Sequence, residues 1–305
     1  MSNIIVTGGA GFIASHLVDR LISQDHKVTI IDNLSTGNIS NINNDAIFYE
    51  SDIRDVKSLD EIFSKERPDF VFHLAAQINL RDSFKDPVND VNNNIIGTLN
   101  IIEVSKKYNI KNLVFTSTGG AIYDPLSSNP PWVEFNQVKP CSPYGISKLA
   151  AENYISTSGL NYNIFRLANV YGPRQNSKGE AGVISIFIDK IRKNENLVIF
   201  GDGEQSRDFI YIDNVIDYLI LPFTKSSIKN TIINVGTGKE TTVNRIAEII
   251  LEKMNSNLNI DYQLPIPGEL RRSSLYSYML SHKGISNVTN FTSIEDGIKK
   301  TIGML

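Results

Sequence analysis

The 305-residue sequence has one cysteine, four histidines and no long apolar run. Because Cys141 is the only cysteine, no disulfide can form within the chain, which is typical of proteins in a reducing cytosol. No stretch approaches the roughly 20 apolar residues that span a bilayer. The opening residues, MSNIIVTGG, have neither the basic segment nor the cleavage site of a secretory signal. We therefore expect a cytoplasmic protein with no membrane partner.

Excess charge of one sign is also missing. A net charge of −3 and a pI near 5.9 give no electrostatic reason to expect a nucleic-acid partner. The four histidines are scattered and match no metal-ligand spacing, so we expect no metal site. With 41% hydrophobic and 21% charged residues, the composition is that of a folded globular protein and excludes a chain that is mainly disordered.

Apolar strands and amphipathic helices alternate along the first half of the chain. The runs NIIVT (Asn3–Thr7) and KVTIID (Lys27–Asp32) flank a helical segment, FIASHLVDRLIS. The same alternation continues with strands at 46–52, 69–76, 112–118 and 161–167 and helices near 58–65, 88–108 and 142–157. Continuously apolar strands are typical of parallel sheets covered on both faces. The pattern predicts an α/β fold with a Rossmann-like doubly wound parallel sheet.

The pattern becomes less regular after about Arg166. Short strand-like pieces (LVIF, DFIYI and TIINV) alternate with helical segments near 183–193, 214–221 and 243–254. We expect a first domain made of residues 1–168 plus part of 206–238. Residues 169–205 and 239–305 are expected to form a smaller mixed α/β C-terminal region.

The first turn between strand and helix is rich in glycine. Gly8, Gly11 and Ala14 stand at G-x-x-G-x-x-A, where glycine lets the backbone approach a pyrophosphate and the helix N-terminus points at its charge. Asp32 ends the next strand, where its carboxylate could bind both ribose hydroxyls and would repel a 2′-phosphate. This context predicts a dinucleotide site that prefers NAD to NADP. The alternatives are a tight turn without a ligand and an Asp32 that only caps a turn.

Tyr144 and Lys148 lie four residues apart on a predicted helix and therefore share one face. With 12 tyrosines and 30 lysines and arginines, about one such pair arises by chance, so the position matters more than the spacing. The helix follows a strand ending in TST, at the sheet edge where open α/β folds bind ligands. A tyrosine has a pKa near 10, and a neighbouring ammonium together with a positive nicotinamide ring would favour its phenolate.

Thr118, at the end of that strand, could hydrogen-bond a sugar hydroxyl and share its proton. We therefore predict Thr118, Tyr144 and Lys148 as the catalytic residues. The alternative is an exposed tyrosine beside a solvated lysine.

A set of motifs follows in the order of one known family. They are TGGAGFIAS, IIDNLSTG, ESDIRD, HLAAQ, NNIIGT, FTSTGGAIY, SPYGISK, FRLANVYGPRQ and RDFIYIDNV. From Asn3 to about Arg272, the chain resembles an extended short-chain dehydrogenase/reductase, and within that group the UDP-glucose (UDP-galactose) 4-epimerases. Single motifs are common, whereas the ordered set is specific.

The resemblance implies NAD as cofactor and a UDP-hexose as substrate. The cofactor-binding positions that it implies are Gly8, Gly11, Phe12, Ile13, Asp32, Asn33, Ser35, Thr36, Gly37, Asp52, Ile53, Leu74, Ala75, Ala76, Gln77, Asn94, Tyr144 and Lys148. The implied substrate-binding positions are Thr118, Tyr144, Asn169, Val183, Phe200, Arg207 and Arg271.

Two segments depart from the usual pattern of these epimerases. The loop STGGAIYD is one residue longer than the serine-rich loop of the family, so Ser117 stays an alternative to Thr118. Ile266 stands where many epimerases carry a diphosphate-binding arginine, and Arg271 or Arg272 is expected to replace it.

The resemblance implies an isomerase of galactose metabolism that interconverts UDP-glucose and UDP-galactose through a 4-keto intermediate. Related 4,6-dehydratases need an Asp-Glu pair after the threonine and related decarboxylases keep a glutamate there, whereas this chain has Gly119 and Gly120. The alternatives are a UDP-GlcNAc or UDP-glucuronate 4-epimerase, a net sugar-nucleotide oxidoreductase and, more distantly, a non-catalytic NAD(H)-binding protein.

Two helices are predicted to be more apolar than contact with their own sheet requires. They lie near Ile95–Val104 and Leu149–Tyr154. Relatives dimerise through these helices as a four-helix bundle, so we expect a homodimer. The alternative is that both faces belong to the core of one chain.

Overall fold

A computed structural model describes residues 1–177, 182–266, 270–285 and 290–304. The chain divides into two compact units. The first unit holds Met1–Ile122, Lys139–Arg166 and Ile216–Ile233, and the second holds Tyr123–Val138, Leu167–Val215 and Asn234–Leu305. The expected boundaries differ in assigning residues 123–138 and 167–168 to the first domain. The division into a cofactor and a substrate region stays a prediction.

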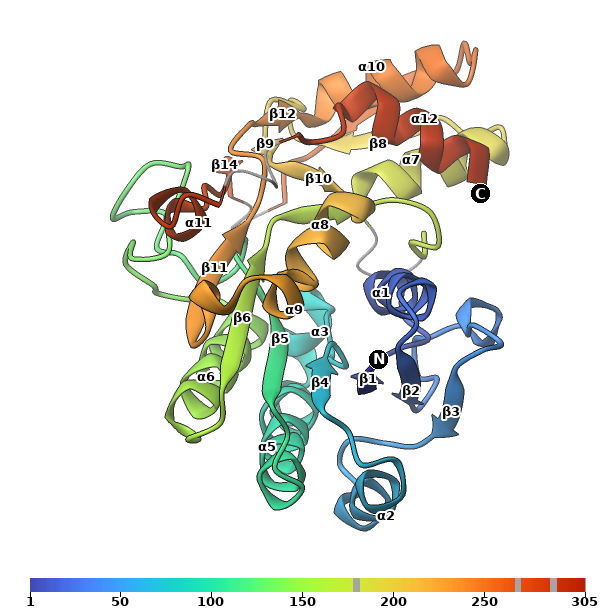
Figure 1. Cartoon of the computed structure of the whole chain (residues 1–305). Helices are drawn as coiled ribbons and strands as arrows, with labels where there is room; N and C mark the ends of the chain where they lie inside the picture. The colour runs from blue at the N-terminus through green and yellow to red at the C-terminus, as the bar shows by residue number, and fades with distance from the viewer. Residues whose placement is uncertain (178–181, 267–269, 286–289, 305) are drawn as a thin grey trace. The chain divides into compact units, whose positions relative to one another are not determined.

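The main sheet has seven strands in the order β11-β6-β5-β4-β1-β2-β3, and Figure 1 shows them side by side. Their bounds are β1 (Asn3–Thr7), β2 (Lys27–Asp32), β3 (Ile47–Glu50), β4 (Phe70–His73), β5 (Asn112–Thr118), β6 (Tyr162–Leu167) and β11 (Thr231–Val235). The pairs β1–β2, β1–β4, β2–β3 and β4–β5 are parallel. The prediction of a Rossmann-like α/β fold is confirmed.

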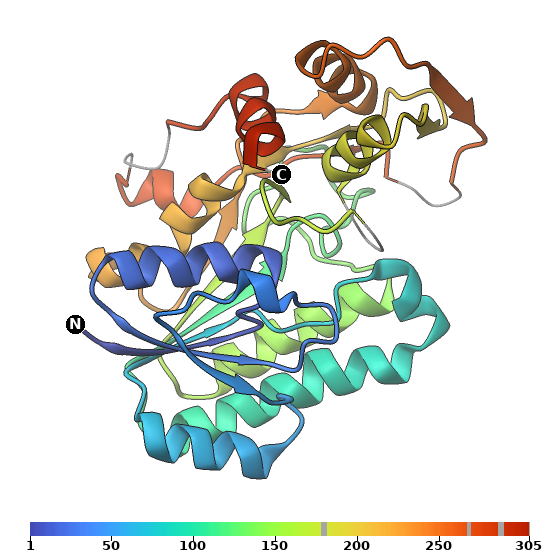
Figure 2. The same ribbon diagram turned by 90° about the vertical axis from the view of Figure 1, so that its right-hand side faces the viewer.

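Helices cover both faces of this sheet, as Figure 2 shows for α1 on one side and for α2, α5 and α6 on the other. Their bounds are α1 (Phe12–Ser23), α2 (Val56–Glu66), α3 (Leu80–Lys85), α4 (Pro87–Val91), η2 (Asn92–Ile96), α5 (Gly97–Lys107), α6 (Pro143–Thr157) and α9 (Leu221–Thr224), with short 3₁₀ turns η1 (Ile39–Asn41) and η3 (Ser226–Ile228). Successive strand residues point to opposite faces. Phe70 and Phe72 therefore contact Phe223 of α9, while Leu113 and Phe115 join the core under α2, α5 and α6.

The second unit is a mixture of short strands and helices. Its strands pair as β10 (Phe209–Tyr211) with β7 (Asn169–Tyr171), β13 (Ile260–Gln263) with β8 (Leu197–Phe200), and β12 (Thr241–Thr242) with β9 (Ser206–Arg207) and β14 (Arg272–Ser273). The helices are α7 (Val183–Arg192), α8 (Ile212–Leu219, which extends into the first unit), α10 (Val243–Lys253), α11 (Tyr278–His282) and α12 (Ile294–Met304). Helix α10 packs against α7 and α12 and buries Ile246 and Ile250.

The predicted helix over residues 88–108 is interrupted in a way that the sequence did not indicate. The chain is α-helical over Pro87–Val91, π-helical over Asn92–Ile96 and α-helical again over Gly97–Lys107. The short helix α3 was also not predicted, because six residues give too little periodicity. Among the described residues, no helix is both long and apolar enough to cross a membrane.

Candidate active site

The glycine-rich turn joins β1 to α1, as predicted. Gly8 has a φ of +74°, and a Cβ at this position would lie 2.8 Å from the backbone nitrogen of Ala75. Only glycine tolerates both the conformation and the close approach. Gly11 precedes α1 and offers no side-chain cap, so the first N–H groups of the helix keep their capacity to bind an anion.

Asp32 ends β2 directly beside this turn. Its buried carboxylate accepts hydrogen bonds from the backbone N–H groups of Ala10 (3.0 Å) and Leu34 (2.8 Å). Each carboxylate oxygen has a second lone pair, so Asp32 can still accept from two hydroxyl groups. Gly37 closes over it, because a Cβ there would lie 3.0 Å from an Asp32 oxygen.

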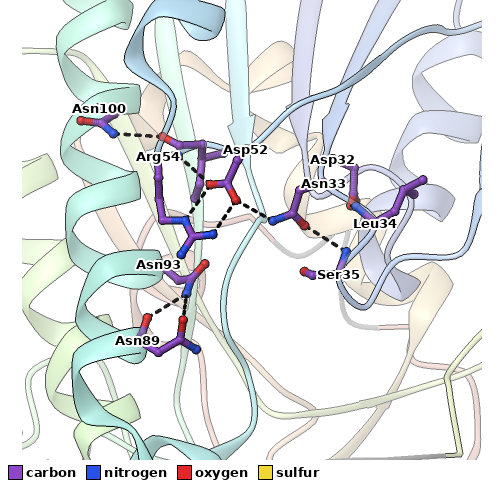
Figure 3. A network of polar contacts seen from close by, with 10 residues as sticks. Asp32, Asn33, Leu34, Ser35, Asp52, Arg54, Asn89, Asn93 and Asn100 are labelled. Carbon is purple, nitrogen blue, oxygen red and sulfur yellow. Dashed lines mark hydrogen bonds and ion pairs between the residues drawn. The ribbon is translucent and has the colours of Figure 1, made fainter.

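Asp52 and Asn33 connect the loops after β3 and β2, as Figure 3 shows. Arg54 binds both carboxylate oxygens of Asp52 at 2.9 and 2.7 Å, and Asn33 donates to the same carboxylate at 2.8 Å. These hydrogen bonds, led by that of Arg54, lower the pKa of Asp52 to about 2. The predicted ribose and adenine positions are therefore joined by one polar network. Ser35 and Thr36 are exposed in the same loop, and Ile53 is buried next to Asp52.

The stretch Leu74–Gln77 follows β4 and is half-buried. The buried side chain of Asn94 holds it, because Asn94 Oδ1 accepts from the Gln77 N–H and Asn94 Nδ2 donates to the Gln77 carbonyl, both at 2.9 Å. The backbone of Ala75 in turn contacts Gly8. The predicted cofactor residues of β4 and of the glycine-rich turn therefore lie together.

Helix α6 begins where the sequence predicts. Ser142 caps it by accepting from the Gly145 N–H at 3.1 Å, Pro143 occupies the first turn, and Tyr144 N–H donates to the buried Ser83 hydroxyl at 3.2 Å. A Cβ on Gly145 would lie only 2.3 Å from the carbonyl oxygen of Ala121. Gly145 thus allows the loop that follows Thr118, the last residue of β5, to pass against the first turn of α6.

Lys148 is buried between α6 and β5. Its ammonium lies 4.0 Å from the ring centre of Phe115, three residues before Thr118, and such a desolvated cation–π contact contributes about 2 kcal/mol. Burial lowers the pKa of Lys148 to about 7, while the charges of Glu152 and Asp90 act in the opposite direction. The structure therefore brings the Tyr144 helix and the end of β5 together, with a lysine whose charge is sensitive to its neighbours.

The predicted substrate residues Asn169, Val183, Phe200, Arg207 and Arg271 all belong to the second unit. A cavity of about 1120 Å³ in this unit is lined by Phe200, Arg271 and Ile266, among others, whereas Asn169, Val183 and Arg207 are not among its lining residues. Arg271 makes a two-point ion pair with Asp202 at 2.6 and 2.9 Å. Arg272 makes a similar pair with Glu240. Both candidate arginines are therefore bound to carboxylates.

Three comparisons with known proteins agree with this geometry. Residues 4–236 match the model of the NAD dependent epimerase/dehydratase family. The chain belongs to this family. The prediction of its family is therefore confirmed, and so is NAD as its cofactor.

The relatives of this NAD-dependent family include two kinds of 4-epimerase. A Methanocaldococcus jannaschii protein, named as a candidate UDP-glucose 4-epimerase, is 48% identical over 278 residues, which are 88% of each chain. UDP-glucose 4-epimerase from Thermotoga maritima, crystallised with UDP-glucose, is 41% identical with a TM-score of 0.93 over 99% of this chain and 98% of that one. UDP-N-acetylglucosamine 4-epimerase from Methanobrevibacter ruminantium, in complex with UDP-N-acetylmuramic acid, is 37% identical with a TM-score of 0.88 over 99% and 97%.

The residues of the first unit fit an NAD molecule. A Cβ on Gly8 would fill the space of the turn, α1 begins without a side-chain cap, and Asp32 keeps lone pairs for ribose hydroxyls. Within the described residues, no group of three acidic, histidine or cysteine side chains could hold a metal ion.

Sequence reasoning missed four residues that build this site. Gly145 and Ser83 position the first turn of α6, Arg54 holds Asp52, and Asp90 lies buried behind Gln77. Gly145 and Arg54 stand inside the motifs SPYGISK and ESDIRD, which could have indicated them. Ser83 and Asp90 lie in segments with no such signal.

Proposed function

We propose that the protein is a UDP-glucose 4-epimerase, which reversibly inverts C4 of a UDP-hexose through a 4-keto intermediate. The observation that carries this proposal is the position of Lys148. It lies against Phe115 near the end of β5, on the same helix as Tyr144 and in the unit that carries the glycine-rich turn. The lack of an acidic side chain at Gly119 and Gly120 supports epimerisation over dehydration.

The chemistry divides between the cofactor and the chain. Bound NAD supplies a hydride acceptor for C4 of the sugar and then a donor for the opposite face. Tyr144, as phenolate, takes the proton of the 4-hydroxyl group and later returns it, and Thr118 hydrogen-bonds the same oxygen. Lys148, when charged, favours the phenolate. Gly8, Gly11 and Asp32 would hold the cofactor, with Asp52 at its adenine.

In this proposal, residues of the second unit hold the nucleotide of the substrate. Phe200 at the end of β8 lies against the base in the cavity, and Arg207, Asn169 and Arg271 bind the diphosphate. Val183 begins α7 beside Gly182 and encloses the uridine.

The proposal is tested by incubating the purified protein with UDP-galactose, with and without added NAD, and following the sugar by NMR. We expect UDP-glucose to form without net accumulation of NADH, and the reverse reaction to reach the same equilibrium. Stoichiometric NADH would indicate a net oxidoreductase instead. No conversion under either condition would refute the assignment.

A UDP-N-acetylglucosamine 4-epimerase is the second candidate. It is favoured by the likeness to the Methanobrevibacter ruminantium enzyme and by Gly120, at which a Cβ would have no atom within 4 Å. Comparing kcat/KM for UDP-glucose, UDP-N-acetylglucosamine and UDP-glucuronate decides among the three substrates.

We also propose that the protein forms a homodimer through α5 and α6. Val91 ends α4 and Ile96 ends η2, directly before α5. Together with Ile146 and Tyr154 of α6, they are large apolar side chains between 39% and 54% exposed. Sedimentation analysis should give a dimer for the wild-type protein and a monomer for Ile146→Lys. A monomeric wild-type protein at micromolar concentration would contradict this.

A further inference from the structure

Asp90 is a carboxylate that the fold buries completely. It lies in α4, immediately before the π-helical segment η2, and its exposed fraction is 0%. A buried carboxylate is costly unless hydrogen bonds and an opposite charge compensate for the loss of water. Segments of π-helix are also frequent at functional sites. The partners of Asp90 therefore indicate what it does.

One oxygen of Asp90 holds the stretch after β4. Asp90 Oδ1 accepts from Gln77 Nε2 and from Asn94 Nδ2, each at 3.1 Å. Asn94 in turn binds both backbone groups of Gln77 at 2.9 Å. Gln77 is therefore fixed through its side chain by Asp90 and through its backbone by Asn94.

The other oxygen of Asp90, Oδ2, is buried and has no hydrogen-bond partner within the described part of the chain. Helix α4 packs against α6, and burial raises the pKa of Asp90, while Ser147, Lys148 and Asn94 lower it. Ser147 and Lys148 are thus close enough to act on the carboxylate, although neither is in hydrogen-bond geometry with Oδ2.

Two buried carboxylates, Glu152 and Asp90, act on the charge of Lys148. Glu152 lies one turn further along α6, but Arg166 binds it through three hydrogen bonds of 2.7 to 3.2 Å, and both side chains are buried. His73, on β4, has a pKa that burial lowers to about 3, so it carries no charge at neutral pH. Among the described residues, the charges of Glu152 and Asp90 both raise the pKa of Lys148, that of Glu152 more strongly. Asp90 is the one of the two that pairs with no arginine of the described ranges.

We propose that Asp90 is a positioning residue for the proposed epimerase. Its carboxylate holds Gln77 beside the cofactor and balances the ammonium of Lys148, which keeps Lys148 charged and Tyr144 ready to act as a base. This inference rests on the proposed function of Tyr144, because a lysine without a catalytic neighbour would not need its charge maintained.

The direct test measures the proton of Lys148 rather than the reaction. Lysines labelled with ¹³C at Cε are titrated by NMR in the wild-type protein and in Asp90→Asn, and Lys148→Met assigns the signal. We expect the titration midpoint of Lys148 to be lower in Asp90→Asn by about one pH unit, because an opposite charge is lost. An unchanged midpoint in a folded variant would overturn the proposal.

Asp86→Asn is the matched control. Asp86 is exposed and caps α4 by accepting from the Asn89 N–H at 2.9 Å, a role that asparagine also fills. Asp86→Asn removes one negative charge from the same segment as Asp90→Asn does. Both the titration midpoint of Lys148 and the activity should stay as in the wild-type protein. A shift of similar size in Asp86→Asn would show a general charge effect and would overturn the proposal.

The pH profile supplies a second readout that a purely structural role would not move. In Asp90→Asn the alkaline limb of kcat should shift to lower pH by about one unit, while KM for the UDP-hexose changes less than about twofold. Loss of stability with an unshifted limb would overturn the proposal. A shifted Lys148 midpoint in a protein that converts no nucleotide sugar would refute the proposed function but leave the charge balance standing.

A double variant keeps the test valid if Asp90→Asn does not fold. Lys148→Met leaves the Asp90 charge buried without its counter-charge, and Asp90→Asn in the same chain removes that charge. We expect the double variant to melt at a higher temperature than Lys148→Met alone. An equal or lower melting temperature would contradict the pairing of the two charges.

Discussion

The two units hold their candidate site residues by different means. In the first unit, Asp32, Asn94 and Lys148 are buried. Backbone N–H groups donate to the side chains of Asp32 and Asn94 at 2.8 to 3.0 Å. The ammonium of Lys148 lies 4.0 Å from the centre of an aromatic ring. In the second unit, Arg271 is exposed and is held by the equally exposed Asp202. Exposed ion pairs contribute little to stability, because water and salt screen them.

The difference separates chemistry from recognition. Proton transfer requires donor and acceptor to be held within a few tenths of an ångström, which a buried core provides. A diphosphate can instead displace a carboxylate from an arginine side chain, because the guanidinium binds both anions in the same forked geometry. We therefore expect substitutions in the first unit to change kcat or cofactor binding, and those at Arg271 to change KM.

The sharpest test of the first unit is Tyr144→Phe. Removing the phenol oxygen should lower kcat by about 10³-fold, because this oxygen is the proposed acceptor of the proton of the 4-hydroxyl. NAD content and melting temperature should stay as in the wild-type protein. Tyr278→Phe, a tyrosine of the second unit that is 41% exposed, is the control and should keep full activity. If Tyr144→Phe retained more than a tenth of the wild-type kcat, the assigned base would be wrong.

A second test concerns the close approach at the glycine-rich turn. Gly8→Ala puts a Cβ 2.8 Å from the Ala75 nitrogen at a φ of +74°, which costs about 1–3 kcal/mol of strain. We expect NAD affinity to fall at least about tenfold, measured by the NAD released from the purified protein. Gly303→Ala, where a Cβ has open space, is the control. Equal NAD content in both variants would show that the turn tolerates a side chain.

Arg271→Gln tests the second unit. If Arg271 exchanges Asp202 for the diphosphate, KM for the UDP-hexose should rise about tenfold, equivalent to about 1.4 kcal/mol, with kcat nearly unchanged. Arg272→Gln separates the two candidate arginines, because Arg272 is bound to Glu240 instead. The same rise in Arg272→Gln and none in Arg271→Gln would reverse their roles. A fall in kcat with KM unchanged would break the comparison between the units.

The sequence was sufficient where a residue's surroundings are local. The turn at Gly8 and the cap at Ser142 depend on a few neighbouring residues, so their predicted positions agree with the structure. Asp202 lies 69 residues from Arg271, and no spacing indicates that the two side chains pair. From the sequence, Asp90 cannot be told from the exposed polar residues around it, because its burial depends on how α4 packs against α6.

His73 shows how tightly the first unit fixes a proton. Thr98 Oγ1 donates its hydrogen to the Asn94 carbonyl at 2.7 Å, so His73 Nε2 must be the donor in its 2.9 Å contact with that oxygen. His73 Nδ1 then accepts from the Thr7 hydroxyl at 2.8 Å, which leaves no place for a second proton. This arrangement agrees with a pKa that burial, and to a smaller extent the charge of Lys148, lower to about 3.

The smallest expected effect follows from this histidine. Between pH 6.5 and 3 the unfolded chain binds a proton at His73 that the folded chain does not, so folding stability falls as the pH falls through this window. Replacing His73 by Gln should lower stability at pH 7.5, yet the further loss on going to pH 5.0 should be about 2 kcal/mol smaller than in the wild-type protein. Urea unfolding at both pH values measures this difference, with His282→Gln, an exposed side chain, as the control. An equal loss between the two pH values in wild type and His73→Gln would mean that His73 takes up its proton in the folded protein, and the first unit would then be less rigid than its hydrogen bonds indicate.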